Sequence, residues 1–135
     1  MTISKTKLTC EEFDRQICEA FPNLYRMRSA DRQTSCMSFG FEIDRGWHDI
    51  VWDLSEKLEA MILTLPEEDR KYVYADQVKS KWAELRFYMS TAIDGMDQEI
   101  SKAEDLSIVT CERCGAPGTQ HGAGWVTTLC EECVK

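Results

Sequence analysis

The chain of 135 residues is predicted to form an α+β fold, with a small antiparallel sheet packed by about three helices and a cysteine-rich module at its C-terminus. Segments with apolar residues at helical spacing and segments typical of strands follow one another without a regular βαβ alternation. This order favours an antiparallel sheet over a parallel one. Four of the seven cysteines follow residue 110, which sets that end of the chain apart.

Three segments have the apolar periodicity of amphipathic helices. The first, over 9–21, opens with a threonine followed three residues later by a glutamate, the sequence of a capping box. The second, over 47–65, has the longest apolar stripe at 3.6-residue spacing and ends before a proline. The third is expected over 92–106 and contains Gly95, which weakens a helix by about 1 kcal/mol relative to alanine.

Three segments are typical of strands. Apolar and polar residues alternate over 36–43, while 72–74 and 85–89 are rich in aromatic or β-branched residues. The segment 76–83 is too short to assign to a helix or a strand from its pattern. The polar segment 26–35 is expected to be a loop.

These elements divide the chain into a flexible N-terminus at 1–8, an α+β core at 9–108 and a cysteine module at 109–135. The helical stripe needs an apolar sheet face to cover it. We therefore expect the helix and the strands to share one core, built from Phe39, Phe41, Trp47, Leu54, Leu58, Leu85 and Phe87.

Composition excludes several classes of protein. The chain has 16 basic and 24 acidic residues and a formal charge of −8, whereas a general binder of phosphate backbones needs a basic surface. No apolar run approaches the roughly 20 residues of a membrane-spanning helix, and no signal peptide is evident. An odd number of cysteines without such a signal favours a reducing compartment, so we expect a cytoplasmic protein.

The cysteine module has the spacing of a zinc ribbon. Cys111 and Cys114 form one Cys-x-x-Cys pair, Cys130 and Cys133 form another, and the intervening residues can form two short strands. Zinc favours four tetrahedral ligands, and a tight turn can aim both sulfurs of a pair at one ion. Two disulfides are a weaker alternative because no export signal is seen. A redox-active pair is also a weaker alternative, because a second Cys-x-x-Cys pair at ribbon spacing would then be a coincidence.

Four thiolates would close the coordination shell, so the predicted zinc is structural. Catalytic zinc usually keeps three protein ligands and one open position. His121 lies between the pairs and could replace one cysteine, but a surface-loop histidine is the simpler interpretation. Four thiolates and one zinc ion would add two negative charges to the formal charge of the chain.

Other reactive residues do not form a recognisable catalytic arrangement. His48 and Asp49 are neighbours on a helix and cannot face each other, so His48 is expected to be solvated or at an interface. Acidic residues at a helix start commonly complement the helix dipole, and here they are Glu42, Asp44, Asp49 and Asp53. The remaining cysteines, Cys10, Cys18 and Cys36, are expected to be free.

One stretch combines basic and aromatic residues, a pattern that can bind single-stranded nucleic acid. Its members are Lys79, Lys81, Trp82, Arg86, Phe87 and Tyr88. The alternative is a strand with one face in the core and one in solvent. The sequence leaves open whether these residues form a binding surface.

From residue 36 onward the chain resembles a family of small hypothetical proteins of bacteriophages and prophages. The resemblance is carried by Gly40-Phe41-Glu42, Asp44-x-Gly46-Trp47 with Asp49, Gln77-Val78-Lys79-x-Lys81-Trp82, Leu85-Arg86-Phe87-Tyr88, Ala103-Glu104 with Ser107, Cys111-x-x-Cys114-Gly115-x-Pro117-Gly118, Trp125 and Thr128-Leu129-Cys130-x-x-Cys133. Ala83 stands where the family often has glycine. The resemblance implies a phage setting and no mechanism.

We therefore expect a zinc-binding, phage-type accessory protein that acts in the host cytoplasm by binding a protein with a basic surface. An inhibitor of antiviral defence or of a nucleic-acid-handling protein would fit this setting. The alternatives are a nucleic-acid-binding zinc-ribbon transcriptional regulator and an enzyme of unknown reaction. No catalytic or cofactor-binding residue is assigned, direct binding of nucleic acid or membrane is not expected, and the oligomeric state is open.

Overall fold

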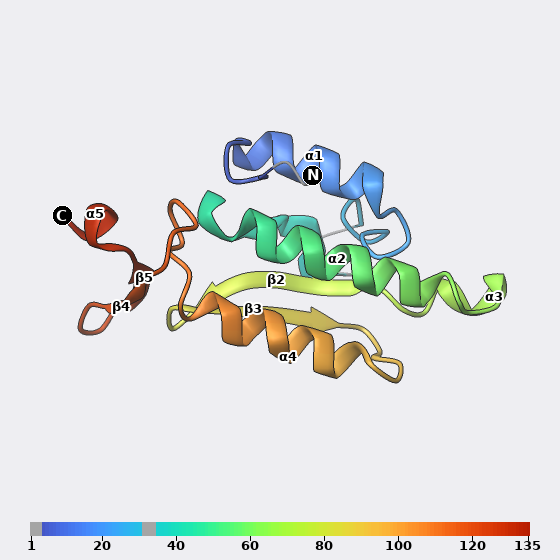
Figure 1. Cartoon of the computed structure of the whole chain (residues 1–135). Coiled ribbons are helices and arrows are strands. Elements are labelled where there is room, and N and C mark those ends of the chain that lie inside the picture. The colour runs from blue at the N-terminus through green and yellow to red at the C-terminus, as the bar shows by residue number, and fades with distance from the viewer. Residues whose placement is uncertain (1–3, 31–34) are drawn as a thin grey trace.

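A computed structural model describes residues 4–30 and 35–135 of the chain (Figure 1). Its helices are α1 (Cys10–Ala20), α2 (His48–Ile62), α3 (Glu67–Arg70), α4 (Met96–Ser107) and α5 (Glu131–Val134), with 3-10 helices η1 (Cys36–Phe39) and η2 (Arg45–Trp47). Its strands are β1 (Phe41–Glu42), β2 (Ala75–Lys81), β3 (Glu84–Met89), β4 (Thr119–His121) and β5 (Thr127–Leu129). The predicted α+β class is confirmed. Parts of the predicted flexible N-terminus and of the predicted loop over 26–35 lie outside the described residues.

The larger sheet has the strand order β1-β2-β3 and is mixed. Strands β2 and β3 form an antiparallel hairpin, while β1 pairs in parallel with β2. The chain between β1 and β2 passes through α2 and α3, and a crossover of this kind is what a parallel pair requires. This three-stranded sheet therefore combines the expected antiparallel pairing with one parallel strand.

The predicted strand over 36–43 was wrong for its first half. The Ser35 hydroxyl accepts a hydrogen bond from the Met37 backbone N–H at 3.1 Å and caps η1. Gly40 follows with φ +84°, a conformation that glycine adopts readily, and only then does β1 begin. Because η1 replaces the strand, Phe39 is 54% exposed and does not join the core, contrary to the prediction.

The unassigned segment 76–83 contributes most of β2 and the turn of the hairpin. The predicted strand over 72–74 is not a strand, since β2 begins at Ala75. Two residues connect β2 to β3, and both have positive φ, 54° for Trp82 and 65° for Ala83. Such two-residue turns match the twist of antiparallel strands, although glycine or asparagine is usually found in them. The tight turn forms without glycine.

Helix α4 begins later than predicted and covers the free edge of β3. Gly95, expected inside the helix, directly precedes it with φ +96°. The Ser107 hydroxyl accepts a hydrogen bond from the Leu85 N–H at 2.9 Å, and the Glu104 carboxylate accepts one from the Phe87 N–H at 3.3 Å. Side chains of α4 thus satisfy backbone donors that would otherwise face solvent.

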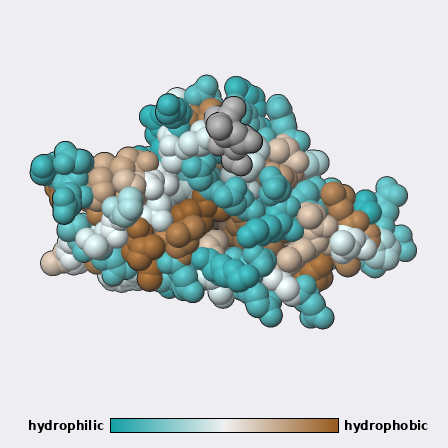
Figure 2. Space-filling model, viewed as in Figure 1, coloured by the Kyte–Doolittle hydropathy of each residue, from teal (hydrophilic) through white to brown (hydrophobic). Residues whose placement is uncertain are grey.

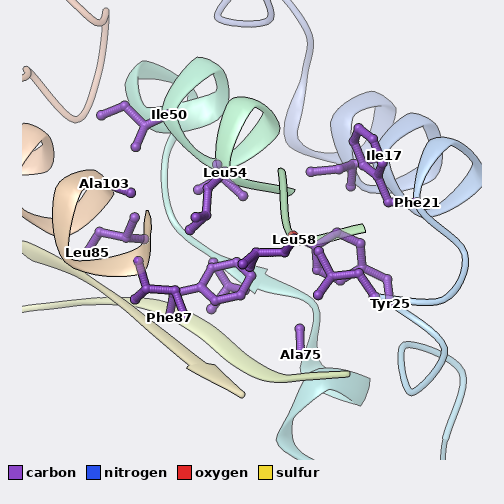
Figure 3. Packing of buried hydrophobic residues seen from close by; sticks show 14 of the residues in the cluster. Ile17, Phe21, Tyr25, Ile50, Leu54, Leu58, Ala75, Leu85, Phe87 and Ala103 are labelled. Carbon is purple, nitrogen blue, oxygen red and sulfur yellow. The ribbon is translucent and has the colours of Figure 1, made fainter. Parts of the chain in front are cut away.

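The core lies between α2 and the β2–β3 hairpin, with α1 packed against α2 from the other side (Figure 1). Leu54 and Leu58 point from α2 toward the sheet, where Leu85 and Phe87 meet them (Figure 3). Trp47 is fully buried in the same cluster, so these five residues confirm the predicted core. Phe41, a further residue predicted to join the core, is partly buried and packs against the cluster.

The cysteine module lies at the end of the molecule opposite α3 (Figure 1). Apolar side chains remain at the surface where α4 leads into this module (Figure 2), including Leu106 and Val109, which are 51% and 53% exposed. None of the described helices has both the length and the apolar character needed to cross a membrane.

Candidate metal centre

The four predicted ligands converge at the C-terminal end of the molecule. Cys111 and Cys114 lie in the turn after α4, Cys130 follows β5 and caps α5, and Cys133 lies in α5. Their sulfur atoms all lie within 4.8 Å of one another, and the Cys114 and Cys130 sulfurs are 3.6 Å apart. Zinc–sulfur bonds of about 2.3 Å in a tetrahedron place the sulfurs about 3.8 Å apart. The arrangement therefore fits a single zinc-sized ion.

The first pair is shaped by a tight turn. Gly115 has φ +85°, and its backbone N–H donates to the Cys111 carbonyl at 3.0 Å. The Cys111 N–H in turn donates to the Ala116 carbonyl at 2.7 Å. A residue with a Cβ would be strained at Gly115, so the glycine after the pair has a conformational reason.

The second pair is held by the last helix. The Cys130 sulfur accepts a hydrogen bond from the Cys133 N–H at 3.4 Å and so caps α5. Between the pairs, β4 and β5 form the expected two-stranded antiparallel ribbon. The ribbon architecture predicted from the spacing is thus present.

The cluster favours a mixture of thiolates and thiols until a cation binds. At Cys111 burial opposes ionisation, but backbone N–H groups outweigh it and lower the pKa to about 6. The neighbouring sulfurs of Cys130 and Cys111 raise the pKa of Cys133 to about 12. Four sulfurs this close cannot all carry charge without compensation. A divalent soft metal ion such as zinc would supply that compensation and release protons when it binds.

Glu112 connects the cysteine cluster to the core. Its side chain is buried, and its carboxylate accepts hydrogen bonds from the Ser80 hydroxyl of β2 at 2.9 Å and from the Thr128 N–H of β5 at 2.8 Å. The Thr128 hydroxyl donates to the Ala83 carbonyl at 2.7 Å, in the turn of the β2–β3 hairpin. The turn that carries Cys111 and Cys114 and the hairpin turn therefore share one hydrogen-bond network.

Helix η2 presses against the same turn. The Gly46 N–H donates to the Glu112 carbonyl at 2.7 Å, and the Trp47 indole N–H donates to the Thr110 carbonyl at 2.9 Å. A Cβ added to Gly46 would lie 2.0 Å from the Cys111 carbonyl oxygen. Only glycine permits this close approach of the two backbones, which fixes the module on the core.

The two histidines lie outside the cluster. The His121 side chain is within 3.1 Å of the Thr119 hydroxyl, in β4, and does not join the four sulfurs. His48 is expected to be solvated or at an interface, and the first of these environments was wrong. It is 1% exposed and stacks on Phe13 with ring centroids 3.9 Å apart, while its Nδ1 lies 3.0 Å from the Lys5 carbonyl. The error arose because a polar residue at a helix start resembles a surface residue when its tertiary neighbours are unknown.

Two of the four acidic residues near the start of α2 have structural partners. Asp44 accepts the Arg45 N–H at 2.7 Å and caps η2, and Asp49 accepts the Ser4 hydroxyl at 2.8 Å. Across residues 4–30 and 35–135, the four cysteines form the one group of possible metal ligands.

Three cysteines lie apart from the cluster and are free thiols, as expected: Cys10, Cys18 and Cys36. Burial, followed by the nearby Asp14 carboxylate, raises the pKa of Cys18 to about 12. The Cys18 thiol is therefore protonated and unreactive at neutral pH.

The basic and aromatic stretch is divided between the core and the surface. Phe87 is buried in the core, whereas Trp82 and Tyr88 are 65% and 43% exposed. Lys79 lies opposite Arg86 in the β2–β3 register, and Arg86 forms a salt bridge with Glu84 at 3.3 Å. The structure therefore does not gather all six residues on one surface.

Two residues near the cluster were given no role in the sequence analysis, although Trp125 is among those that carry the family resemblance. Glu112 lies between the two cysteines of the first pair, yet its side chain is buried. Trp125 is 85% exposed in the loop between β4 and β5 and follows a glycine. The available signal for Trp125 was a tryptophan in a glycine-flanked loop, whereas no local pattern marked Glu112.

No family model, curated protein or solved structure matches the chain. The fold and the site define an α+β protein with a C-terminal four-cysteine cluster that could hold a metal ion.

Proposed function

We propose that this is a zinc-binding accessory protein of phage type, which acts in the host cytoplasm by binding another protein. The observation that carries the proposal is the four-sulfur cluster, which is built into the fold through Glu112 and Gly46. Because four thiolates close the coordination shell, the zinc would stabilise a surface rather than perform chemistry.

Surface tryptophans support a binding role. Trp82 and Trp125 are 65% and 85% exposed, although tryptophan is costly to leave in water and is enriched among residues that dominate protein interfaces. The formal charge of −8 favours a partner with a basic surface. An inhibitor of host antiviral defence or of a nucleic-acid-handling protein would meet these conditions.

The test is affinity capture from infected host cells with the zinc-loaded protein, read by mass spectrometry and repeated at increasing salt. We expect salt-sensitive recovery of a specific basic protein, followed by direct binding of the purified pair. If none of the purified candidate proteins binds, the proposal is rejected.

The second candidate function is a nucleic-acid-binding regulator, and the observation in its favour is exposed Trp82 beside Lys79 and Lys81. Phosphate contacts release counterions and give affinity that falls with salt. Titration with single- and double-stranded oligonucleotides at about 150 mM salt, where the Debye length is about 8 Å, separates the two functions. Sub-micromolar binding that a Lys79→Ala, Lys81→Ala double variant loses would favour the regulator.

A further inference from the structure

The turn between β2 and β3 has an unusual conformation for its sequence. It lies at the end of the hairpin that faces the cysteine module (Figure 1). Its two residues, Trp82 and Ala83, have φ values of +54° and +65°, which residues with a Cβ rarely adopt. Such conformations persist where the surrounding structure enforces them. The turn also leaves the Trp82 side chain 65% exposed, so burial of the indole does not account for the conformation.

Two hydrogen bonds from the cysteine module hold this turn. The Thr128 hydroxyl donates to the Ala83 carbonyl at 2.7 Å. The Ser80 hydroxyl, on β2 just before the turn, donates to the Glu112 carboxylate at 2.9 Å. Thr128 and Ala83 are fully buried, so water cannot readily replace their hydrogen bond if it breaks. The conformation of the turn therefore depends on where Glu112 and Thr128 lie.

Glu112 and Thr128 are bonded to each other and lie beside the cysteine cluster. The Glu112 N–H donates to the Thr128 carbonyl at 2.9 Å, and the Thr128 N–H donates to the Glu112 carboxylate at 2.8 Å. Glu112 directly follows Cys111, and Thr128 lies two residues before Cys130. A zinc ion bound to both cysteines would fix the separation of these two segments where they contact the turn.

Little else joins the two segments within the module. Among the described residues, their buried apolar cluster consists of Cys111, Leu129 and Cys130, with Ala116 and Cys133 packed against it. So small a cluster buries little apolar surface, and the hydrophobic effect that stabilises it is correspondingly weak. Loss of an ion from the four sulfurs would therefore allow the segments to separate, and with them the two groups that hold the turn.

The rest of the hairpin is held from outside the cysteine module. The Leu85 N–H donates to the Ser107 hydroxyl of α4 at 2.9 Å. At the other end of the hairpin, Ala75 pairs with Met89, and the Ala75 N–H donates to the Leu24 carbonyl at 2.8 Å. These bonds do not involve the cysteine cluster. A change in the module would therefore reach the turn and stop there.

We propose that occupancy of the four-cysteine site by zinc controls the conformation of the β2–β3 turn and so the display of Trp82. With the ion bound, Glu112 and Thr128 hold Trp82 and Ala83 at positive φ. Without it, both residues relax to negative φ and the indole loses its fixed position. This inference rests on the zinc binding of the proposed function and makes one of its surface tryptophans dependent on the metal.

The test uses the full-length protein, first loaded with zinc and then stripped of it by a chelator under reducing conditions. Backbone NMR measures φ in the turn through chemical shifts and through the coupling between amide and α protons. We expect Trp82 and Ala83 to lose their positive φ when zinc is removed. Ala75 and Met89, at the other end of the hairpin, are the internal control and should keep their signals.

A substitution in β5 should break the coupling while zinc stays bound. Thr128→Val removes the hydroxyl that holds the Ala83 carbonyl and changes the shape of the side chain little. The zinc-loaded variant should therefore keep its metal, by elemental analysis, and show the turn signals of the zinc-free wild type. Thr127→Val is the matched control, because it makes the same change one residue earlier in the strand, where the side chain points to the opposite face.

The coupling should also act in the reverse direction, because two linked equilibria affect each other equally. Asparagine adopts positive φ more readily than tryptophan, so Trp82→Asn should bind zinc about fivefold more tightly, at the lower end of usual couplings between sites. Competition with a chromophoric chelator measures the affinity. Trp125→Asn makes the same substitution at an 85% exposed tryptophan outside the turn and should leave the affinity unchanged.

An unchanged turn in the zinc-free protein would overturn the inference, although zinc binding itself would stand. Retention of the turn conformation in zinc-loaded Thr128→Val would also overturn it. Loss of the Ala75 and Met89 signals without zinc would overturn it as well, because the metal would then support the whole hairpin. A protein that binds no zinc rejects both proposals. If the turn responds to zinc but no purified host protein binds, the coupling stands and the proposed function is rejected.

Discussion

The core and the cysteine module reach their folds by different means. In the core, one cluster of buried apolar side chains joins α1, α2, α4 and the hairpin. In the module, the buried apolar cluster of the described residues contains Leu129 and the two ligands Cys111 and Cys130. The core can therefore be stabilised by the hydrophobic effect, whereas the module has a few hydrogen bonds to the core and a four-cysteine cluster that could hold a metal ion.

Loss of the metal should have the largest effect and should be confined to one region. Purified protein should contain about one zinc atom per chain by elemental analysis. Structural zinc contributes roughly 10–16 kcal/mol of apparent binding free energy in small modules, so Cys130→Ser should unfold residues 109–135 while the core persists. Backbone amide NMR spectra would resolve the two regions. The control is Cys36→Ser, an exposed cysteine outside the cluster; a metal-free protein with a fully folded C-terminus would contradict the prediction.

A cavity made in the core should destabilise the core and leave the metal content unchanged. Leu58 is fully buried between α2 and the sheet, and Leu58→Ala should lower the free energy of unfolding by about 2–5 kcal/mol. Urea denaturation followed by circular dichroism measures the loss, and the zinc content of the folded protein should not change. A loss below about 0.5 kcal/mol would show that this helix face does not carry core packing.

A third substitution probes the junction between the two regions. Gly46→Ala places a methyl group 2.0 Å from the Cys111 carbonyl oxygen, so the backbones must separate. We expect a destabilisation of about 3 kcal/mol, together with weaker zinc retention in competition with a chelator. Gly124→Ala is the matched control for an added methyl group, because no atom lies within 4 Å of a Cβ there, although its positive φ adds some strain. Equal zinc retention in both variants would show that the junction does not support the metal centre.

The strained hairpin turn predicts a small gain in stability. Asparagine adopts positive φ more easily than tryptophan, so Trp82→Asn should raise the free energy of unfolding by about 1 kcal/mol. Urea denaturation gives the stability, and a destabilised variant would show that the indole contributes more to folding than its conformation costs.

The smallest expected effect is a dependence on pH from the core. Burial lowers the pKa of His48 below its usual 6.5, so the folded protein binds fewer protons than the unfolded chain. Stability should therefore fall as pH drops through about 6.5 and stop falling, for this group, below the folded pKa. Thermal unfolding between about pH 8 and pH 5 measures the trend. His48→Phe keeps an aromatic ring on Phe13 without a titrating group and should show a flatter profile; an unchanged profile would contradict the prediction.

Much of the fold and the metal centre was predictable because the signals were local. The capping box of Thr9 and Glu12 forms as expected, with hydrogen bonds of 2.9 and 3.1 Å, and the apolar stripe of α2 faces the sheet. The ribbon followed from the cysteine spacing, since a coordination tetrahedron restricts how two pairs can be arranged. In each case the deciding interaction joins residues a few positions apart or depends on a short repeat.

The errors concern residues whose environment comes from distant parts of the chain. Segment 36–43 alternates like a strand, yet its first half forms η1, where the Arg28 guanidinium donates to the Ser38 carbonyl at 3.0 Å. His48 became a core residue because Phe13 and Lys5 cover it. No pattern within a segment records which other segment will pack against it.

The junction between the core and the cysteine module shows the same division between local and long-range information. The chain alone specifies the four cysteines Cys111, Cys114, Cys130 and Cys133, because they are a matter of spacing. The junction required Ser80, Glu112 and Thr128 to meet from three separate segments. A buried carboxylate needs hydrogen-bond donors. Which donors lie within reach of Glu112 depends on tertiary contacts between segments that are distant in the sequence.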